Sequence, residues 1–385
     1  MPTAAARTAL IEPFYVMEVV KEAAGLAAAG HSVIHLSIGE PDFTAPAPVR
    51  RAAIAAIERG ETQYTGALGL QPLRERISDW YAKRFGCDVG ADRIVVTAGA
   101  SGALLLACAA LLERDGELLM PDPSYPCNRH FATVLGGRAR LVPCGPEQRF
   151  QLTAADVDSN WTRATGGVLV ASPSNPTGTS VEPRVLAESI EAVKRRNGFV
   201  ISDEIYQGLS YGHAPASALQ ASDDVVVINS FSKYFSMTGW RLGWIAAPAA
   251  LVPVLEKLAQ NLYICPSTIA QHAALACFDD AAIAVYEERR VEFQRRRDFL
   301  VPALREIGFG IPVVPDGAFY IYADIQRFSD DSFAFVRELL RATGVCLVPG
   351  KDFGHASPER YARISYATSL DRLEEAVERM RRYLR

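Results

Sequence analysis

Short apolar runs alternate with helical or loop stretches through the middle of the chain. RIVVTAG (93–99) precedes a helical stretch over residues 101–113, and the later strand-like runs are ELLMPDPSY, ARLVPC, GGVLVASPSNPTG, GFVISDEIY and VVVINSFSKY. These runs are short, β-branched and nearly continuous, which is typical of strands buried on both faces. Strands that alternate with helices predict a large three-layer α/β/α domain with a mostly parallel, mixed sheet.

The pattern changes toward the C-terminus. Residues 281–309 resemble one long charged helix, a plausible connector. Beyond it, the runs VVPDGAFYIYADI, FAFVRELLRATGVCLVPG, RYARISYA and SLDRLEEAVERMRRYLR predict strand, helix–strand, strand and helix. We therefore expect a large domain over residues 45–285, followed by a smaller α/β domain that includes residues 286–385.

Polar side chains follow the predicted strands at the point where each strand ends. In chain order they are Ala100 with Ser101 at a helix start, Tyr125, Asn175, Asp203 with Tyr206, and Ser230 with Lys233. Right-handed crossovers bring the carboxyl ends of parallel strands to one edge, where ligands of open α/β sheets bind. This set predicts a site for a ligand that is anionic, aromatic and reactive toward amines.

Lys233 is the first candidate for chemistry, because it is one of six lysines and follows a strand predicted to be buried. A lysine amine forms a Schiff base with an aldehyde once desolvation or a nearby cation lowers its pKa. Arg241 could be that cation, or it could bind a phosphate together with Ser230 and the helix start at Ala100 and Ser101.

The remaining strand-end residues suit an aromatic ring. Asp203 would be costly at a buried strand end unless it met a permanent positive charge, such as a protonated pyridine nitrogen. Tyr206 and Asn175 could donate to a phenolate oxygen of that ring, and Tyr125 could stack on its face. The cofactor that meets these demands is pyridoxal 5′-phosphate.

Each residue also has a simpler interpretation. Lys233 could be a solvated loop lysine, Asp203 a helix cap, and Asn175 part of a turn. The SxxK spacing occurs in serine acylases as well, but no SDN or KTG partner stands in a fitting place. The joint pattern, in chain order and at successive strand ends, favours the cofactor site.

Composition excludes several classes of partner. The chain has 385 residues, a formal net charge of −4 and 49% hydrophobic residues. No basic stripe indicates nucleic acid, and the longest apolar run, residues 102–112, is shorter than the roughly 20 residues of a membrane span.

The first 14 residues lack a clean signal sequence. The seven cysteines lack a CxxC pair, so we expect reduced thiols in a cytoplasmic protein and no metal site.

The chain resembles the fold-type I, class I/II aminotransferases. The stretches that carry the resemblance span nearly the whole chain: LSIGEPDF (36–43), YTGALGLQPLRERI (64–77), VVTAGASGAL (95–104), SPSNPTGT (172–179), ISDEIY (201–206), NSFSKYFSMTGWRLGW (229–244), PDGAFY (315–320) and RISYA (363–367). The resemblance implies pyridoxal phosphate as cofactor, and it implies that residues 1–44 join residues 286–385 in the small domain.

The resemblance also implies roles for individual residues. Lys233 would hold the cofactor and then shuttle the proton. The other implied contacts are Asp203 to the ring nitrogen, Tyr206 and Asn175 to the ring oxygen, Tyr125 on the ring face, and Ser230, Arg241 and the backbone at Ala100 and Ser101 to the phosphate. Arg363 would bind the substrate carboxylate, with Asn175 beside it and the backbone of Gly39 assisting. Tyr64 would reach the phosphate in a neighbouring subunit, so a homodimer is implied.

The resemblance implies transfer of an amino group from an L-amino acid to a 2-oxo acid by ping-pong chemistry. No motif supplies a second cation for a side-chain carboxylate, so a strict preference for aspartate or glutamate is not expected. Phe319 and Tyr15 could line a more apolar pocket or belong to the core. A β-elimination lyase on the same scaffold and a non-enzymatic ligand sensor remain as alternatives, although no segment for DNA binding precedes the pattern.

Overall fold

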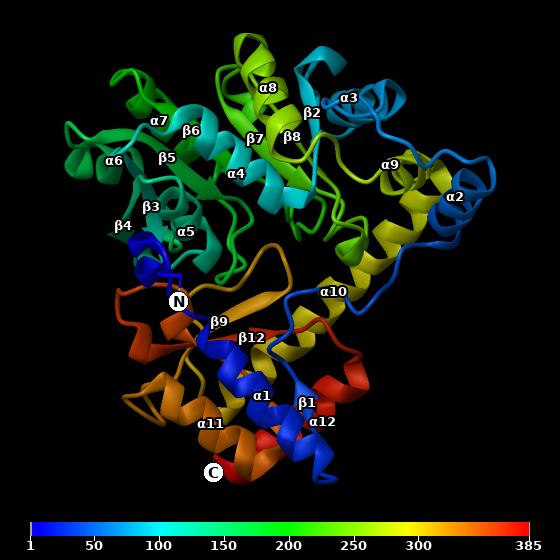
Figure 1. Ribbon diagram of the computed structural model, residues 1–385. Helices are drawn as coiled ribbons and strands as arrows, with labels where there is room; N and C mark the ends of the chain where they lie inside the picture. The colour runs from blue at the N-terminus through cyan, green and yellow to red at the C-terminus, as the bar shows by residue number, and fades with distance from the viewer. Residues whose placement is uncertain (1, 385) are drawn as a thin grey trace.

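A seven-stranded sheet forms the centre of the larger part of the molecule (Figure 1). The structure, a computed structural model, describes residues 2–384. The strands, in their order across the sheet, are β2 (Ile94–Thr97), β8 (Gly243–Ala246), β7 (Val226–Ser230), β6 (Phe199–Asp203), β5 (Thr165–Ala171), β3 (Glu117–Asp122) and β4 (Arg138–Pro143). β8 runs antiparallel to β2 and β7, and the other neighbours are parallel. The predicted mostly parallel, mixed sheet is confirmed.

Helices cover both faces of this sheet, because alternate residues of its strands point in opposite directions. On β2, Val95 packs in one apolar cluster, while Ile94 and Val96 pack in another. The cluster around Val95 includes residues of α4 (Gly99–Leu111), α5 (Pro126–Val134) and α8 (Val252–Leu262). The opposite cluster includes residues of α3 (Gln71–Phe85), α6 (Ala154–Asn160) and α7 (Pro183–Lys194). The predicted three layers are therefore present.

The smaller part of the molecule has two small sheets (Figure 1). One joins β1 (Ile34–His35) to β10 (Val345–Cys346), and the other has the order β11 (Val348–Pro349), β12 (Tyr361–Ser365), β9 (Tyr320–Asp324). Three helices accompany them: α1 (Tyr15–Ala28), α11 (Ser332–Thr343) and α12 (Leu370–Tyr383). The segment from α1 to β1 thus lies beside β10, β11 and α11, whereas the short helix at Ala6–Leu10 contacts α5 of the large part.

The helix α10 (Asp280–Ile307) connects the two parts, close to the span predicted for one long helix. The expected domain boundary at residue 285 falls inside this helix, and the boundaries themselves stay a prediction. At the side of the large part, α2 (Ala47–Glu58) and α9 (Thr268–Leu275) pack against each other.

Two further observations concern the whole described chain. All seven cysteines are unpaired. Within residues 2–384, none of the helices combines the length and the apolar character needed to cross a membrane.

Candidate active site

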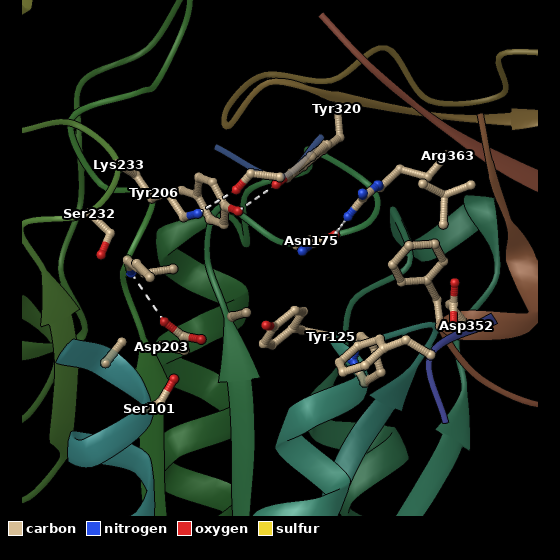
Figure 2. Close-up of a pocket in the computed structure, with 18 of the residues that line it drawn as sticks. Ser101, Tyr125, Asn175, Asp203, Tyr206, Ser232, Lys233, Tyr320, Asp352 and Arg363 are labelled. Atoms are coloured by element: carbon tan, nitrogen blue, oxygen red, sulfur yellow. Dashed lines mark hydrogen bonds between the residues drawn. The ribbon is translucent and has the colours of Figure 1, made fainter. Parts of the chain in front are cut away.

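A cavity of about 280 Å³ lies where the carboxyl ends of the large sheet face the smaller part (Figure 2). Both parts supply its walls, together with the N-terminal segment. The residues predicted from the sequence that line it are Gly39, Ala100, Ser101, Tyr125, Asn175, Asp203, Tyr206, Lys233, Arg241 and Arg363. The two other predicted residues, Tyr64 and Ser230, do not line the cavity.

Lys233 stands three residues beyond the end of β7, and its side chain enters the cavity. The ammonium nitrogen Nζ donates to the carbonyl oxygen of Gly39 at 2.5 Å. The pKa of Lys233 is lowered to about 8, chiefly by burial and in part by the nearby cations Arg363 and Arg241, while Glu40 and Asp203 oppose the shift. About a tenth of this amine is therefore neutral at pH 7, and the neutral form is the one that attacks a carbonyl carbon.

Asp203 is the last residue of β6 and is 5% exposed. Burial raises the pKa of its carboxyl group to about 6, against the opposing effects of a hydrogen bond from Ile205 N and the charge of Lys233. Within residues 2–384, no cation forms an ion pair with this carboxylate, which lines the cavity. A buried carboxylate of this kind calls for a positively charged ligand group.

Two tyrosine hydroxyls meet above the cavity. The hydroxyl oxygens of Tyr206 and Tyr320 lie 2.8 Å apart, and both side chains are buried. Tyr320 is the first residue of β9, so this bond joins the large part to the smaller one. The two hydroxyls hold only two protons, and one of these is free to point at a ligand oxygen.

Arg363, in the middle of β12, is held by neutral acceptors. Its Nη1 donates to Asn175 Oδ1 at 2.9 Å and its Nη2 to Ser37 O at 2.8 Å. The guanidinium carbon lies 4.4 Å from the ring centroid of Tyr320 and 5.0 Å from that of Phe353. Among the residues that the structure describes, none forms an ion pair with it. Arg363 therefore presents an uncompensated, pre-oriented cation to the cavity, suited to a carboxylate.

Another cation lies at the opposite end of the cavity, beside the start of α4. A Cβ atom placed on Gly99 would lie 3.0 Å from Nη2 of Arg241, so the guanidinium touches the first turn of this helix. Ala100, Ser101 and Ser232 line the same end. Exposed backbone N–H groups and a positive helix end beside an arginine form an anion site suited to phosphate.

Ser230 does not line the cavity, whereas Ser232, two residues further along the chain, does. Ser230 is 1% exposed, and its Oγ lies 2.9 Å from Ser232 Oγ and 3.1 Å from Leu242 O. Ser232 lines the cavity and donates its N–H to Ser230 Oγ at 3.0 Å. A phosphate contact for Ser230 stays a prediction, and Ser232 is an additional candidate that the strand-end reasoning did not include.

Sequence reasoning missed the apolar wall of the cavity. Tyr15 and Phe319 do not line it; Phe319 is fully buried and stacks on Phe293, and Tyr15 packs on Phe333. Their chain neighbours Phe14, Val16 and Tyr320 do line the cavity, and the 348–353 segment adds Val348 and Phe353. The carboxylate of Asp352 lies in the lining beside these apolar residues. Only Tyr320 belongs to a stretch, PDGAFY, that the sequence singled out.

The cavity fits pyridoxal phosphate by its own chemistry. It holds a lysine with a lowered pKa, a buried carboxylate without a cation, an anion site at a helix start and an arginine without a carboxylate. Each of these is an unsatisfied feature of the protein alone, and each has a counterpart on the cofactor or on an amino acid substrate.

Comparisons with known proteins agree with this chemistry. The family model for class I and II aminotransferases matches residues 31–380. The valine–pyruvate aminotransferase of Mycobacterium tuberculosis is 41% identical over 379 residues, which are 97% of each chain. An aspartate aminotransferase of Pyrococcus abyssi is 35% identical over 386 residues, covering 98% of this chain and 97% of the other.

Solved structures of aminotransferases are also similar to this chain. A crystal structure of an aminotransferase from Mycobacterium tuberculosis superposes with a TM-score of 0.96 at 41% identity, covering 100% of this chain and 99% of that one. The chain therefore belongs to the class I and II aminotransferases. It is a pyridoxal-phosphate-dependent enzyme that moves an amino group from an amino acid to a 2-oxo acid. The relatives give no support to the lyase alternative.

Proposed function

We propose that this enzyme takes its amino group from amino acids with apolar side chains and passes it to a small 2-oxo acid such as pyruvate. The observation that carries the proposal is the wall near Arg363, where Phe14, Val16, Val348 and Phe353 surround the space left for a substrate side chain. Apolar walls favour apolar side chains because both lose their contact with water on binding.

The charged residues around the cavity also favour amino acids with apolar side chains as donors. Its lining has three cations, Lys233, Arg241 and Arg363, and the cofactor with the substrate α-carboxylate accounts for all of them. Near the apolar wall stands the carboxylate of Asp352, which accepts from Tyr15 N at 2.7 Å and from Val16 N at 2.8 Å. The next cation, Arg129, donates to Asp352 O and Glu12 and lies outside the lining. A second substrate carboxylate would meet this acid, and the lining holds no further cation to bind it.

Each predicted residue keeps a role in this proposal. Asp203 pairs with the ring nitrogen, and Tyr206 with Asn175 orients the ring oxygen. Arg241, Ser230 and the backbone at Ala100 and Ser101 hold the phosphate, and Tyr125 lies against the ring. Arg363 and Gly39 bind the α-carboxylate and so fix the direction of the Cα–H bond. The geometry described above supports these assignments, and mutagenesis tests them.

Bound pyridoxal phosphate supplies the aldehyde that takes up the amino group and a ring that withdraws electrons from the substrate Cα. The chain would supply the proton transfer: the neutral Nζ of Lys233 would accept the proton from the substrate Cα and would later give it back, so that no net proton is gained or lost. Asp203 keeps a proton on the ring nitrogen, because a buried carboxylate stabilises the cation beside it.

The donor proposal is tested by mixing the loaded enzyme with single amino acids in the absence of a 2-oxo acid. Conversion to pyridoxamine phosphate, followed by absorbance, gives a rate for each donor. We expect valine, leucine and alanine to react with a higher kcat/KM than aspartate or glutamate. In the reverse half-reaction we expect pyruvate to surpass oxaloacetate. A higher kcat/KM for aspartate than for valine would contradict the proposal. Pyruvate and ammonia released together, without an acceptor, from a donor that carries a sulfur leaving group on Cβ would indicate elimination.

We also propose that two copies of the chain assemble with shared active sites. Tyr64 is 78% exposed and remote from the cavity of its own chain. The loop that bears it lies against α9, where Thr268 Oγ1 donates to Gln63 O at 2.6 Å. Large exposed apolar side chains occur in nearby elements: Ile54 and Ile57 on α2, and Leu262 and Ile264 before α9. A second copy would cover this apolar surface.

Subunit complementation tests the shared site. A Lys233→Ala chain and a Tyr64→Ala chain are each expected to have low activity alone. Mixed dimers combine the intact Lys233 of one chain with the intact Tyr64 of the other, so activity should return on mixing and subunit exchange. A mixture with no more activity than the sum of its parts would contradict the role of Tyr64. Molecular mass in solution provides the independent measure of the dimer.

A further inference from the structure

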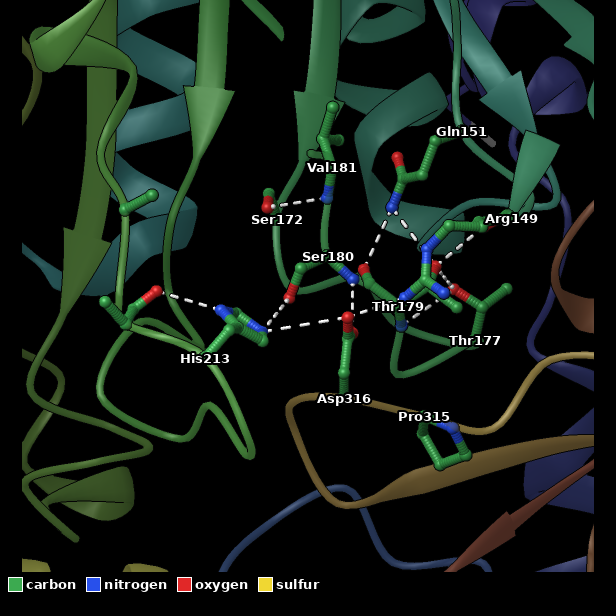
Figure 3. Close-up of polar contacts among 12 residues, drawn as sticks. Arg149, Gln151, Ser172, Thr177, Thr179, Ser180, Val181, His213, Pro315 and Asp316 are labelled. Carbon is green, nitrogen blue, oxygen red and sulfur yellow. Dashed lines mark hydrogen bonds and ion pairs between the residues drawn. The ribbon is translucent and has the colours of Figure 1, made fainter. Parts of the chain in front are cut away.

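Four polar side chains form a cluster outside the cavity, at the loop that precedes β9 (Figure 3). At its centre is the carboxylate of Asp316. Oδ1 accepts from Ser180 N at 2.7 Å, and Oδ2 accepts from Arg149 Nη2 at 2.5 Å. His213 Nε2 lies 3.7 Å from the same Oδ2 and 3.4 Å from Ser180 Oγ. None of the four residues lines the cavity.

The combination of serine, histidine and aspartate is not a nucleophilic triad. In a triad, the serine and the aspartate bind different nitrogens of the imidazole, so that the ring can pass a proton. Here Ser180 and Asp316 both approach Nε2 of His213, while Nδ1 lies 2.8 Å from Ala214 O. The cluster therefore needs a different explanation.

The backbone around Asp316 connects three segments that carry site residues. Asp316 N and Gly317 N donate to Gly178 O at 3.0 and 2.9 Å, in the loop that contains Asn175. On the other side, Tyr211 N donates to Asp316 O at 2.8 Å, and Ala318 N donates to Leu209 O at 2.9 Å, in the segment that follows Tyr206. The chain then enters β9, which begins with Tyr320.

These segments are in direct backbone contact. A Cβ atom on Gly178 would lie 2.5 Å from Tyr320 O and 2.6 Å from Pro315 Cβ. One on Gly317 would lie 2.4 Å from Pro173 Cγ. With so little space between them, a displacement of the Asp316 loop is transmitted to the segments that bear Asn175 and Tyr320.

We propose that Asp316 is a positioning residue for the aminotransferase reaction. By binding Ser180 N and Arg149 together, its carboxylate fixes the relative positions of Asn175, Tyr206 and Tyr320. Arg149 reinforces the same loop, because its carbonyl oxygen accepts from Thr179 Oγ1 at 2.8 Å. Asn175 in turn orients Arg363, so the substrate carboxylate site depends on Asp316 without touching it. This role does not depend on which amino acid is the donor.

Asp324, at the other end of β9, offers a matched control. Its Oδ1 accepts from a backbone N–H, that of Gln326, at 2.9 Å, and its Oδ2 accepts from Arg360 Nε at 2.7 Å. The two aspartates thus have the same kinds of partner, a backbone N–H and an arginine, although Asp316 lies in the loop before β9 and Asp324 is the last residue of β9. Asp324 lies outside the cavity lining, and its hydrogen bonds join it to Gln326, Arg360 and Gly310.

The experiment compares Asp316→Ala and Asp316→Asn with Asp324→Ala and Asp324→Asn. We expect Asp316→Ala to lower kcat/KM by about 10- to 100-fold, chiefly through KM, because small misplacements of binding groups are costly. Asp316→Asn keeps an acceptor for Ser180 N and should show a smaller loss. Affinity of the cofactor-free enzyme for pyridoxal phosphate, measured by equilibrium dialysis, should weaken in parallel. Both Asp324 variants should keep wild-type kinetics and cofactor affinity.

Two results would overturn the proposal. One is wild-type KM and cofactor affinity in Asp316→Ala; the other is an equal loss in the Asp324 variants, which would indicate general destabilisation. If Asp316→Ala does not fold, Asp316→Asn and Arg149→Ala give the same comparison. In the double variant, the losses from Arg149→Ala and Asp316→Ala should not add, because the two side chains act through one contact.

Discussion

The two ends of the cavity are built in different ways. At the cofactor end, Lys233, Asp203 and Ser101 lie at or just beyond the ends of strands of the mostly parallel large sheet and bring charge or hydroxyl groups to a common edge (Figure 2). At the substrate end, Phe14, Val348 and Phe353 come from distant segments of the chain and supply apolar surface. In the proposed function, the cofactor end performs the chemistry that all substrates share, and the apolar end selects among the substrates. Changes at the cofactor end should therefore abolish turnover, whereas changes at the apolar end should alter preference.

The largest effect is expected for Lys233→Ala. The variant loses both the amine that holds the cofactor and the base that moves the Cα proton, so kcat should fall more than about 1,000-fold. Stopped-flow absorbance of the half-reaction with an amino acid measures this loss. Lys257→Ala, on α8 and away from the cavity, is the control and should retain wild-type rates. Turnover at the wild-type rate in Lys233→Ala would remove this residue from the reaction.

Arg363→Ala is expected to lower activity less than Lys233→Ala does. It removes a group that binds the substrate and leaves the proposed base, Lys233, in place. Loss of the fork that holds the substrate carboxylate should lower kcat/KM by about 3 kcal/mol, or about 100-fold, mostly by raising KM. Arg360→Ala, on the preceding turn, removes an arginine that pairs with Asp324 at 2.7 Å and should leave KM unchanged. An unchanged KM in Arg363→Ala would place the carboxylate elsewhere.

The pKa of Lys233 predicts how the cofactor-free enzyme captures pyridoxal phosphate. Only the neutral amine attacks, and burial lowers the pKa of this lysine to about 8 from its usual value near 10.5. The capture rate should therefore rise about tenfold per pH unit up to pH 8 and then level off. N-acetyl-lysine is the control, since its rate should keep rising to about pH 10. A capture rate that still rises above pH 9 would contradict the lowered pKa.

Tyr320→Phe tests the bond that joins the two parts of the cavity. The change removes a single hydroxyl group and its 2.8 Å bond to Tyr206. We expect a loss of about 1 kcal/mol, or about fivefold in kcat/KM, with weaker binding of pyridoxal phosphate. Tyr322→Phe is the matched control two residues along β9, where the ring stacks on Tyr361 outside the cavity. Equal effects of the two changes would contradict a specific role for Tyr320.

The contrast between the two ends also explains what the sequence could predict. Asp203 and Lys233 were found because buried strands are easy to recognise and their carboxyl ends share one edge. Ser232 was missed in favour of Ser230, since only the three-dimensional course of the turn decides which hydroxyl faces the cavity. Tyr15 and Phe319 were named as possible pocket residues, but each lies one position from a residue that lines the cavity.

The apolar wall gave no sequence signal for a physical reason. Val348 and Phe353 differ in no local respect from core residues, and they line a cavity only because β11 and the turn after it pack beside the N-terminal segment. The antiparallel strand β8 was likewise part of a quoted stretch, NSFSKYFSMTGWRLGW, but was not assigned as a strand. Its short length and the intervening turn hide the alternation that identifies a strand.

The smallest expected effect, and the sharpest test of the contrast, is a change at the apolar end. Val348→Ala removes two methyl groups from the wall without touching any charged group, and Val348 is 1% exposed. The added space should favour a larger donor such as leucine or phenylalanine over valine. A methyl or methylene group in a pocket is worth about 1–3 kcal/mol, and because Val348→Ala only adds space we expect less than the low end of this range, a shift of under about fivefold in the ratio of kcat/KM values.

Single-donor half-reactions of the two enzymes measure this ratio directly. Capture of pyridoxal phosphate should stay close to wild type, because it depends on the cofactor end. Val336→Ala, a buried valine of α11 that does not line the cavity, controls for the loss of core packing. If Val348→Ala slows every donor equally and slows cofactor capture as well, the two ends are not independent, and selection among donors must lie in another part of the wall.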